Sequence, residues 1–489
     1  MLTVLAASLL TGLAQAAPCE NLQTLARPNT TITAARLVPA GQAAGQAGAL
    51  PAHCRVAAVL RPVPDSQITV EIWMPAENWN GKFQAVGNGG WAGTVSLGAM
   101  REALRAGYAT ASTDTGHQAG QGQSQGGAAF ALGHPEKVTD FAYRAVHEMT
   151  VTAKAIIAAY YERPARLSYF NGCSTGGRQG MMEAQRFPED YDGIVAGAPV
   201  YNMIHLSASQ VQRQVESIGA PARRLSPEKI TLLANAVLAA CDVRDGVGDG
   251  FLSDPETCAF NPVALACTAG DGQSCLTAPQ VETVNRAYST MKLKTGESVY
   301  PGSAIGFEAG LRMPDAPLEL HFSPFRYIGR QDATWDPMSF DLETDLALAL
   351  KHGGAIEAND PNLAAFRARG GKLLLYHGWA DPGPAPANTI AYYRSVERTL
   401  GGSQESWMRV FMMPGVGHCG GGRGPDEADF IGALDRWRES GSAPARIDAA
   451  RVTNGRVELT RPLCPYPQVA RYKGTGSTDE AANFVCASN

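Results

Sequence analysis

The chain has 489 residues, of which 45% are hydrophobic and 18% charged, so it can form a large buried core and more than one domain-sized unit. The formal net charge of −5 gives no basic excess, which argues against nucleic acid as a partner. After the first residues no apolar run approaches the length of a membrane span, so no membrane-spanning helix is expected.

The N-terminal residues have the pattern of an export signal. Residues 2–13 are apolar and small, and Ala14-Gln15-Ala16 fits the small-x-small rule for cleavage. We therefore predict a signal peptide at residues 1–16 and a secreted or periplasmic protein, although no lysine or arginine precedes the apolar run. An apolar helix of the fold is the alternative. Ten cysteines, an even number, also favour an oxidising compartment.

The segment after the signal is expected to be mostly loop as far as residue 64, because Ala, Gly and Pro are frequent in it. Alternating β-forming residues then predict a strand at 67–74. Apolar residues at helical spacing predict a helix at 139–160. Shorter β-forming runs predict strands at 82–86, 108–112, 166–170 and 194–196.

The pattern changes between residues 201 and 370, where polar helices, aspartate–glycine turns and four cysteines replace the alternation of strands and helices. We interpret this stretch as one inserted lid domain, 201–370. Alternation resumes afterwards, with strands predicted at 372–376 and 407–412 and helices at 386–400 and 426–438. Strands that alternate with helices indicate an α/β fold built on a mostly parallel sheet.

A candidate nucleophile lies in Gly172-Cys173-Ser174-Thr175-Gly176, which has the G-x-S-x-G spacing between a predicted strand and a predicted helix. This setting is typical of the nucleophile elbow of the α/β-hydrolase fold, where the glycines permit a crowded, strained turn. Ser174 would then stand exposed above the sheet. A glycine-rich turn with a capping serine is the alternative. Residues 17–200 and 371–489 are accordingly assigned to an α/β-hydrolase catalytic domain.

The other two members of a triad are sought downstream, because the chain order in this fold is nucleophile, acid, histidine. His418 lies in a glycine-rich loop just after a predicted strand, and Asp381 follows the buried strand before it. Asp381 would hold the tautomer of the imidazole and stabilise the imidazolium. Asp426 is interpreted as a helix cap and His377 as a buried structural residue.

Two cysteines flank these candidates, Cys173 before the serine and Cys419 after the histidine. If Ser174 and His418 meet, their neighbours meet too, so a Cys173–Cys419 disulfide is expected; two buried thiols are the alternative. Short sequence separations suggest three further pairs, Cys241–Cys258, Cys267–Cys275 and Cys464–Cys486.

Three motifs together resemble the tannase and feruloyl esterase family, which includes the hydrolase of mono-(2-hydroxyethyl) terephthalate (MHET). They are Gly-Cys-Ser-x-Gly-Gly-Arg at 172–178, His-Gly-Trp-x-Asp at 377–381 and Gly-x-Gly-His-Cys-Gly-Gly-Gly at 415–422. The resemblance implies a lidded α/β-hydrolase that acts on esters of aromatic acids. It also implies five disulfides, which map to Cys19–Cys54, Cys173–Cys419, Cys241–Cys258, Cys267–Cys275 and Cys464–Cys486.

The oxyanion hole of this fold uses the backbone N–H after the nucleophile, here that of Thr175, and one from an earlier loop. The resemblance places the second donor at Gly90 in Gly87-Asn88-Gly89-Gly90; a plain tight turn is the alternative.

Residues 242–251, the aspartate loop, carry three carboxylates among glycines, a pattern that suits Ca²⁺ as well as a solvated turn. The resemblance implies a structural calcium in the lid and no organic cofactor. Its ligands would be the side chains of Asp242, Asp245 and Asp249 and the carbonyls of Val247 and Phe251.

The expected function is a secreted serine carboxylesterase that hydrolyses a small aromatic ester through an acyl-enzyme. Feruloyl (hydroxycinnamoyl) esters are the first choice, with galloyl esters and MHET as alternatives. MHET would need a cation for its free carboxylate. Candidates for that cation in the lid are Arg312, Arg326 and Arg330. Candidates for holding an aromatic ring are the lid residues Phe322, Phe325, Tyr327 and Trp335, together with Trp379 beside the acid. An inactive calcium-dependent binding protein and a serine peptidase are the rival functions.

Overall fold

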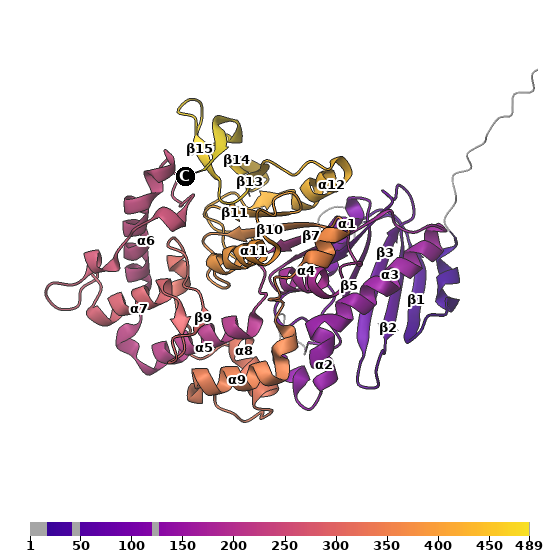
Figure 1. The fold of residues 1–489 in the computed structure, drawn as a ribbon, viewed down its shortest axis with the longest axis horizontal. Coiled ribbons are helices and arrows are strands. Elements are labelled where there is room, and N and C mark those ends of the chain that lie inside the picture. The colour runs from indigo at the N-terminus through magenta and orange to yellow at the C-terminus, as the bar shows by residue number, and fades with distance from the viewer. Residues whose placement is uncertain (1–16, 42–48, 120–126, 489) are drawn as a thin grey trace, which may run out of the picture.

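The computed structural model describes residues 17–41, 49–119 and 127–488, so the predicted signal peptide at 1–16 lies outside the described residues. A nine-stranded sheet forms the centre of the molecule, in the order β1-β2-β3-β5-β4-β6-β7-β10-β11 (Figure 1). Its strands are β1 (Thr30–Val38), β2 (His53–Leu60), β3 (Ile68–Pro75), β4 (Lys82–Val86), β5 (Ala109–Thr113), β6 (Leu167–Cys173), β7 (Gly193–Gly197), β10 (Lys372–Gly378) and β11 (Met408–Met413).

The six strands β5, β4, β6, β7, β10 and β11 run parallel to one another, whereas β1, β2 and β3 form an antiparallel edge that pairs with β5. Every residue of β4, β5 and β7 is buried, as expected of parallel strands that are covered on both faces. The fold is therefore a mixed, mostly parallel sheet of the α/β-hydrolase type, as predicted.

The prediction of loops up to residue 64 is wrong, because β1 and β2 lie in this segment. Only one face of β1 is covered, so its sequence TTITAARLV shows little hydrophobic alternation. The buried face of β1 is defined only by its pairing with β2. The register sets Ala35 opposite Val56, and both are buried.

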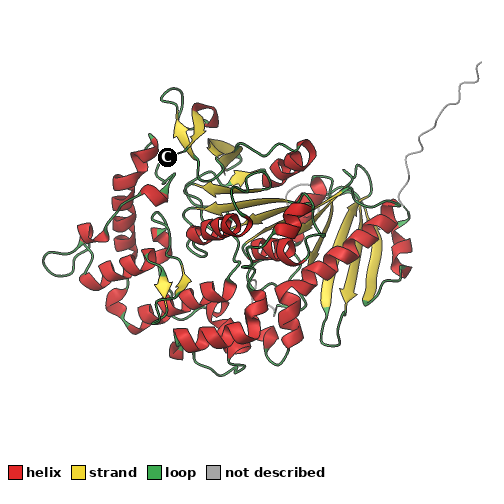
Figure 2. Cartoon of the chain, viewed as in Figure 1, coloured by secondary structure: helices red, strands yellow, loops and turns green. Residues whose placement is uncertain are grey.

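Helices cover both faces of the sheet (Figure 2). Side chains of α3, α4 and α11 share one hydrophobic cluster with the sheet, and those of α1 and α12 share another. The helices are α1 (Leu97–Arg105), α2 (Pro135–Thr139), α3 (Ala145–Tyr161), α4 (Thr175–Arg186), α5 (Met203–Gly219), α6 (Pro227–Cys241), α7 (Ala278–Tyr288), α8 (Glu319–Ser323), α9 (Leu342–Gly353), α10 (Ala364–Ala368), α11 (Pro386–Leu400) and α12 (Phe430–Ser440).

Two helix predictions need correction at their ends. The helix expected at 139–160 is α2 and α3, joined without a break by a π-helical turn at Asp140–Arg144. The helix expected to begin at Asp426 begins at Phe430, and Asp429 caps it by accepting from the N–H of Gly432. Asp426 instead accepts from the N–H of Gly421 at 2.7 Å, within the loop that carries His418.

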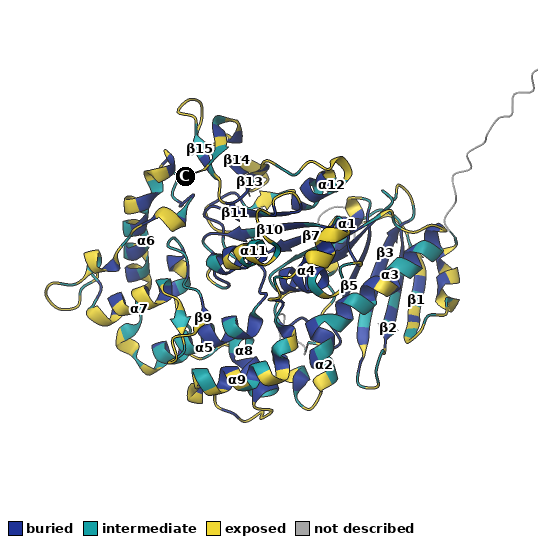
Figure 3. Cartoon of the chain, in the orientation of Figure 1, coloured by how far each residue is buried: buried dark blue, intermediate teal, exposed yellow. Residues whose placement is uncertain are grey.

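The chain between β7 and β10 is mainly helical and contains α5 to α10, as Figure 1 shows. Part of it has a hydrophobic cluster of its own, formed by residues between 225 and 311. Other residues of this segment, such as Ile204 and Phe325, share a cluster with Trp91 and Phe141, which precede β6 in the chain. The exact bounds of a lid domain at 201–370 stay a prediction. Burial is densest along the sheet and the helices beside it (Figure 3).

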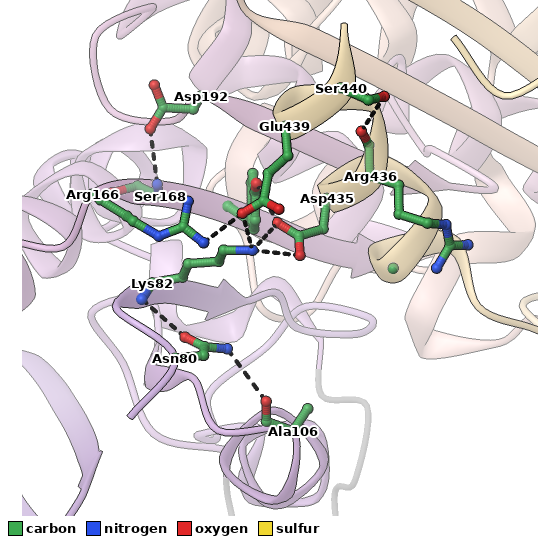
Figure 4. Close-up of polar contacts among 12 residues, drawn as sticks. Asn80, Lys82, Ala106, Arg166, Ser168, Asp192, Asp435, Arg436, Glu439 and Ser440 are labelled. Atoms are coloured by element: carbon green, nitrogen blue, oxygen red, sulfur yellow. Dashed lines mark hydrogen bonds and ion pairs between the residues drawn. The ribbon is translucent and has the colours of Figure 1, made fainter. Parts of the chain in front are cut away.

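A buried lysine at the start of β4 holds α12 against the sheet (Figure 4). Lys82 of β4, with only 6% of its side chain exposed, pairs with Asp435 at 2.5 Å and Glu439 at 2.8 Å. Arg166 also pairs with Glu439, and Tyr169 of β6 donates to Asp435 at 2.6 Å. Because Lys82 is nearly dry, its two carboxylate partners offset the cost of burying its charge.

The remaining strands form three small sheets outside the central one. They are β8 (Met291–Lys292), β9 (Ser298–Tyr300), β12 (Glu427–Ala428), β13 (Ile447–Thr453), β14 (Arg456–Leu463), β15 (Val469–Tyr472) and β16 (Phe484–Ala487). Within the described ranges, none of the helices combines the length and the apolar character that crossing a bilayer requires.

Candidate active site

Ser174 lies in a sharp turn between β6 and α4. Its backbone has φ 64° and ψ −122°, a strained conformation for a residue with a side chain. The turn is crowded: a Cβ on Gly172 would lie 2.7 Å from the backbone of Gly176. The N–H of Ser174 is tied to the carbonyl of Gly197 at 2.9 Å, which holds the turn over the end of β7. This geometry is that of a nucleophile elbow.

Three predicted residues meet in one hydrogen-bonded line. His418 Nε2 lies 2.8 Å from Ser174 Oγ, and His418 Nδ1 lies 2.7 Å from Asp381 Oδ2. Asp381 is 1% exposed, whereas a third of the His418 side chain reaches solvent. The imidazole therefore stands between a buried carboxylate and a hydroxyl that a substrate can reach, the arrangement required for base-assisted nucleophilic attack.

A second histidine contacts the acid, and sequence reasoning did not assign it this contact. His377 Nε2 lies 3.1 Å from Asp381 Oδ2 and His377 Nδ1 lies 2.8 Å from Thr389 Oγ1, while the N–H of Gly383 donates to Asp381 Oδ1 at 2.8 Å. Burial acts to raise the pKa of Asp381, but the hydrogen bonds from His377 and His418 outweigh it and hold the pKa below its ordinary value. The prediction that His377 is buried is confirmed, since it is 0% exposed.

The structure contains the five expected disulfides, and none of the cysteines among the described residues is free. Cys173 and Cys419, with Cα atoms 5.9 Å apart, join positions separated by 246 residues in the chain. This bond connects the residue before Ser174 to the residue after His418, so it limits how far nucleophile and base can separate.

The two predicted oxyanion donors lie beside each other. Thr175 Oγ1 donates to the carbonyl of Gly90 at 2.6 Å, which connects the glycine loop to the start of α4. Thr175 is the first residue of α4, so its N–H has no acceptor within the helix and is available to a ligand. The glycine loop is held further by Asn88, whose carbonyl accepts from the N–H of Gly176 at 2.7 Å.

A cavity of about 370 Å³ opens beside His418, in the size range of small-molecule sites. Residues of α6 and of the loops after β10 and β11 share its wall, so both the inserted segment and the sheet domain contribute to it. Its larger apolar side chains are Leu238, Phe251, Leu252, Ile305, Phe307 and Trp379.

Most of the lid aromatics expected to hold a substrate ring lie elsewhere. Phe322, Phe325 and Trp335 are buried in a hydrophobic cluster away from the cavity wall, and Tyr327 packs against that cluster. Trp379 does line the cavity. Phe307 also lines it, but its sequence context carries no signal that separates it from a core residue.

The arginines named from the sequence are not in the cavity wall either. Arg326 donates to the carbonyl of Trp335 at 2.8 Å, and Arg330 pairs with Asp345 at 2.6 Å. Arg312 lines a different surface hollow. Arg423, which follows the His418 glycines, lines the cavity and is exposed. Sequence reasoning missed it because only the fold brings this loop to face α6.

The three carboxylates of the aspartate loop are close in the sequence but have different partners. Asp242 accepts from the N–H of Gly250 at 3.0 Å, and Asp245 accepts from the N–H of Val247 at 2.9 Å. Asp249 forms an ion pair with Arg461 of β14. Oδ1 of Asp249 is nevertheless buried with no hydrogen-bond partner, and hard oxygen donors of this kind suit Ca²⁺.

Fold and site together place the protein among the α/β-hydrolases. Residues 54–313 and 323–487 match the family model described as "Tannase and feruloyl esterase", and the chain belongs to that family. It is 37% identical to an uncharacterized esterase of Xanthomonas campestris, over 98% of this chain and 92% of the relative. The protein is thus an ester-hydrolysing member of the tannase family.

Two further relatives bear on its chemistry. The mono(2-hydroxyethyl) terephthalate hydrolase of Piscinibacter sakaiensis is 32% identical, over 97% of this chain and 92% of the relative. The crystal structure of feruloyl esterase B from Aspergillus oryzae superimposes with a TM-score of 0.87 at 31% identity, covering 96% of this chain and 99% of the other.

Proposed function

We propose that the protein is a serine carboxylesterase that cleaves esters of aromatic acids through an acyl-enzyme. One observation carries the proposal: His418 lies within hydrogen-bond distance of both Ser174 Oγ and Asp381 Oδ2. A serine hydroxyl becomes an effective nucleophile only when a positioned base takes its proton, and the geometry supplies that base.

The reaction follows from the positions of these groups. Ser174 Oγ attacks the ester carbonyl carbon while His418 Nε2 takes its proton, and Asp381 stabilises the imidazolium. The N–H groups of Thr175 and Gly90 donate to the developing oxyanion. When the C–O bond to the alcohol breaks, His418 returns the proton to the leaving oxygen. Water, deprotonated by the same nitrogen, then attacks the acyl carbon. The bond to Ser174 Oγ breaks, the acid leaves, and His418 returns the proton to Oγ.

Feruloyl esters are the proposed substrate class. Trp379 and Phe307 contribute to the wall of the cavity beside His418, and flat hydroxycinnamoyl groups pack well against aromatic side chains. The similarity to feruloyl esterase B over nearly the whole chain supports the same choice. Galloyl esters fit the same apolar wall and stay an alternative.

A terephthalate monoester is the second candidate, and Arg423 is the observation that favours it. Its exposed guanidinium lies in the cavity wall with His418, where it can pair with a free carboxylate on the far side of the ring. Arg423→Gln is expected to lower kcat/KM for the monoester about 10-fold and to leave methyl ferulate unaffected. Arg312→Gln, at an exposed arginine outside the cavity, is the matched control.

The deciding experiment combines labelling with a substrate panel. A fluorophosphonate probe should label Ser174 covalently, and methyl ferulate should be turned over faster than methyl gallate, a terephthalate monoester or a peptide. Absence of labelling together with calcium-dependent ligand binding would favour the inactive binding protein. Preferential peptide turnover would favour a peptidase.

We also propose a structural calcium in the aspartate loop and export from the cytoplasm. The ligands would be the side chains of Asp242, Asp245 and Asp249 and the carbonyls of Val247 and Phe251, and the ion would brace the lid without taking part in chemistry. Export is supported by the five disulfides, which persist in oxidising compartments. N-terminal sequencing of the exported protein, with cleavage expected after residue 16, tests it.

A further inference from the structure

A second cluster of titratable side chains lies at the other end of the nucleophile helix. His147 of α3, Glu183 of α4 and Asp190, in the connection from α4 to β7, place their ligand atoms within 4.8 Å of one another. In the part of the chain that the structure describes, no other three His, Cys, Asp or Glu residues come together in this way. None of them takes part in the proposed ester hydrolysis.

Glu183 has no group that satisfies its carboxylate. The residue is 1% exposed, and both of its Oε atoms are buried without a hydrogen-bond partner. Burial and the neighbouring carboxylate of Asp190 raise the pKa of Glu183 well above its ordinary value. A buried carboxylate beside another one requires either a proton or a cation between them.

A neighbouring lysine, Lys154, acts on Glu183 through its charge but does not hydrogen-bond to it. Lys154 donates to the backbone carbonyls of Glu189 and Asp190, so its ammonium is held at the main chain. His147 Nδ1 lies 2.7 Å from Asp190 Oδ2, and its ring stacks on Phe187 with the ring centroids 3.8 Å apart. A quarter of the His147 side chain is exposed, which leaves the cluster a path to solvent.

We propose that His147, Glu183 and Asp190 bind a divalent transition-metal ion of the Zn²⁺ type, with water as the fourth ligand. One imidazole nitrogen and two carboxylates form a ligand set that suits Zn²⁺. Ligand atoms about 2.1 Å from a tetrahedral ion lie about 3.4 Å apart, so the present spacing needs only a small adjustment of side chains. Bound there, the ion connects α3, α4 and the connection to β7.

The site is structural, because it is remote from the reacting groups. Glu183 lies nine positions after Ser174, which at 1.5 Å per residue is about 13.5 Å along α4. The expected consequence of metal binding is therefore a higher thermal stability of the sheet domain, with little change in kcat.

The test is a Zn²⁺ titration of the purified full-length chain, stripped of transition metals with a chelator and kept in calcium chloride throughout. Isothermal titration calorimetry should give one equivalent of Zn²⁺ per chain, and Co²⁺ should produce visible d–d bands. Excess Zn²⁺ should raise Tm by about 3 °C at a hundredfold excess over Kd.

Three variants make the result specific. Glu183→Gln and His147→Gln should both lose the Zn²⁺ equivalent, the Co²⁺ bands and the rise in Tm. Glu189→Gln, at the exposed carboxylate in the neighbouring turn, should keep all three. Far-UV circular dichroism verifies that each variant is folded. The proposal is overturned if the wild-type chain takes up no Zn²⁺, or if Glu183→Gln binds it as well as the wild type does. If the wild-type chain takes up no Zn²⁺ and Glu183→Gln melts at a higher temperature than the wild type without metal, the two carboxyl groups of Glu183 and Asp190 share a proton instead of a metal ion.

Discussion

The Ser174 site and the aspartate loop both depend on aspartate carboxylates, but the two regions hold them by different means. At the Ser174 site, each polar atom of the line has a protein partner, and a disulfide joins the residue before Ser174 to the residue after His418. In the aspartate loop, Asp242 and Asp245 accept backbone N–H groups, whereas Asp249 reaches to Arg461 in another part of the fold and keeps one oxygen unpaired. A site made wholly of protein groups is complete once the chain has folded, whereas a cation site is completed by its ion.

The largest effect is expected when the nucleophile of the Ser174 site is removed. Ser174→Ala should reduce kcat/KM for methyl ferulate by roughly 10⁴-fold or more, because it removes the hydroxyl that His418 Nε2 contacts. Tm should stay unchanged, since the methyl group fits the elbow. Ser442→Ala, at an exposed serine, is the control. Retained turnover in Ser174→Ala would refute the assigned mechanism.

The next prediction compares the disulfide of the Ser174 site with one of the inserted segment that carries the aspartate loop. Replacing Cys173 and Cys419 by serine should cost about 5 kcal/mol of unfolding free energy, because the bond closes a loop of 246 residues. Replacing Cys267 and Cys275, which close a loop of 8 residues in the inserted segment, should cost about 2.5 kcal/mol. Urea unfolding measures both. Replacing the first pair should also lower kcat. If both replacements change the free energy of unfolding and kcat by the same amounts, the Cys173–Cys419 disulfide has no special role in catalysis.

A smaller effect is expected from the buried histidine behind the acid. His377→Gln should lower kcat about 10-fold with little change in KM, because Asp381 loses a partner that orients it. His352→Gln, at an exposed histidine, should leave both constants unchanged. A KM effect without a kcat effect would exclude a positioning role for His377.

The pH dependence of stability gives the same variant an independent readout. The folded-state pKa of Asp381 is below its ordinary value of about 3.9, so the group stabilises the fold above that pH. This contribution is lost as the pH falls through the folded-state pKa. With a donor removed, the pKa of Asp381 rises, and acid unfolding of His377→Gln should begin at a higher pH than in the wild type.

The smallest expected effect concerns the aspartate loop. Chelation with EGTA should lower Tm by about 2–4 °C, because a calcium that binds only the folded chain stabilises it. Asp245→Asn should make Tm insensitive to calcium, whereas Asp315→Asn, at an exposed aspartate of the inserted segment, should retain the response. Identical melting of the wild-type chain in calcium and in EGTA would remove the calcium from the proposal.

Local patterns predicted a large part of the fold. The strand at 82–86 and the helix at 386–400 have the predicted bounds, because their apolar spacing is complete within a few turns or pleats. β1 and β2 were missed, since their hydrophobic faces exist only when the two strands pair. Asp426 was mistaken for a cap because any aspartate just before an apolar periodicity fits that pattern, and Asp429 does so three residues later.

The candidate site shows the same division. Ser174, Asp381 and His418 stood out because each lies in a glycine-containing turn after a predicted strand. The second contact of Asp381 with His377 and the place of Arg423 in the cavity wall depend on side-chain directions. No spacing rule encodes those directions.

By itself the sequence determined the local turns, the strands of the parallel part of the sheet, and the three residues that follow strand ends. These depend on interactions within about ten residues, where glycine conformation and apolar periodicity dominate. Only the tertiary structure decided which distant groups meet: Ser174 with His418, Arg461 with Asp249, and Glu183 with Asp190. Such contacts arise from the pairing of strands and the packing of helices on them. Pairing and packing become favourable in free energy only when the whole core forms.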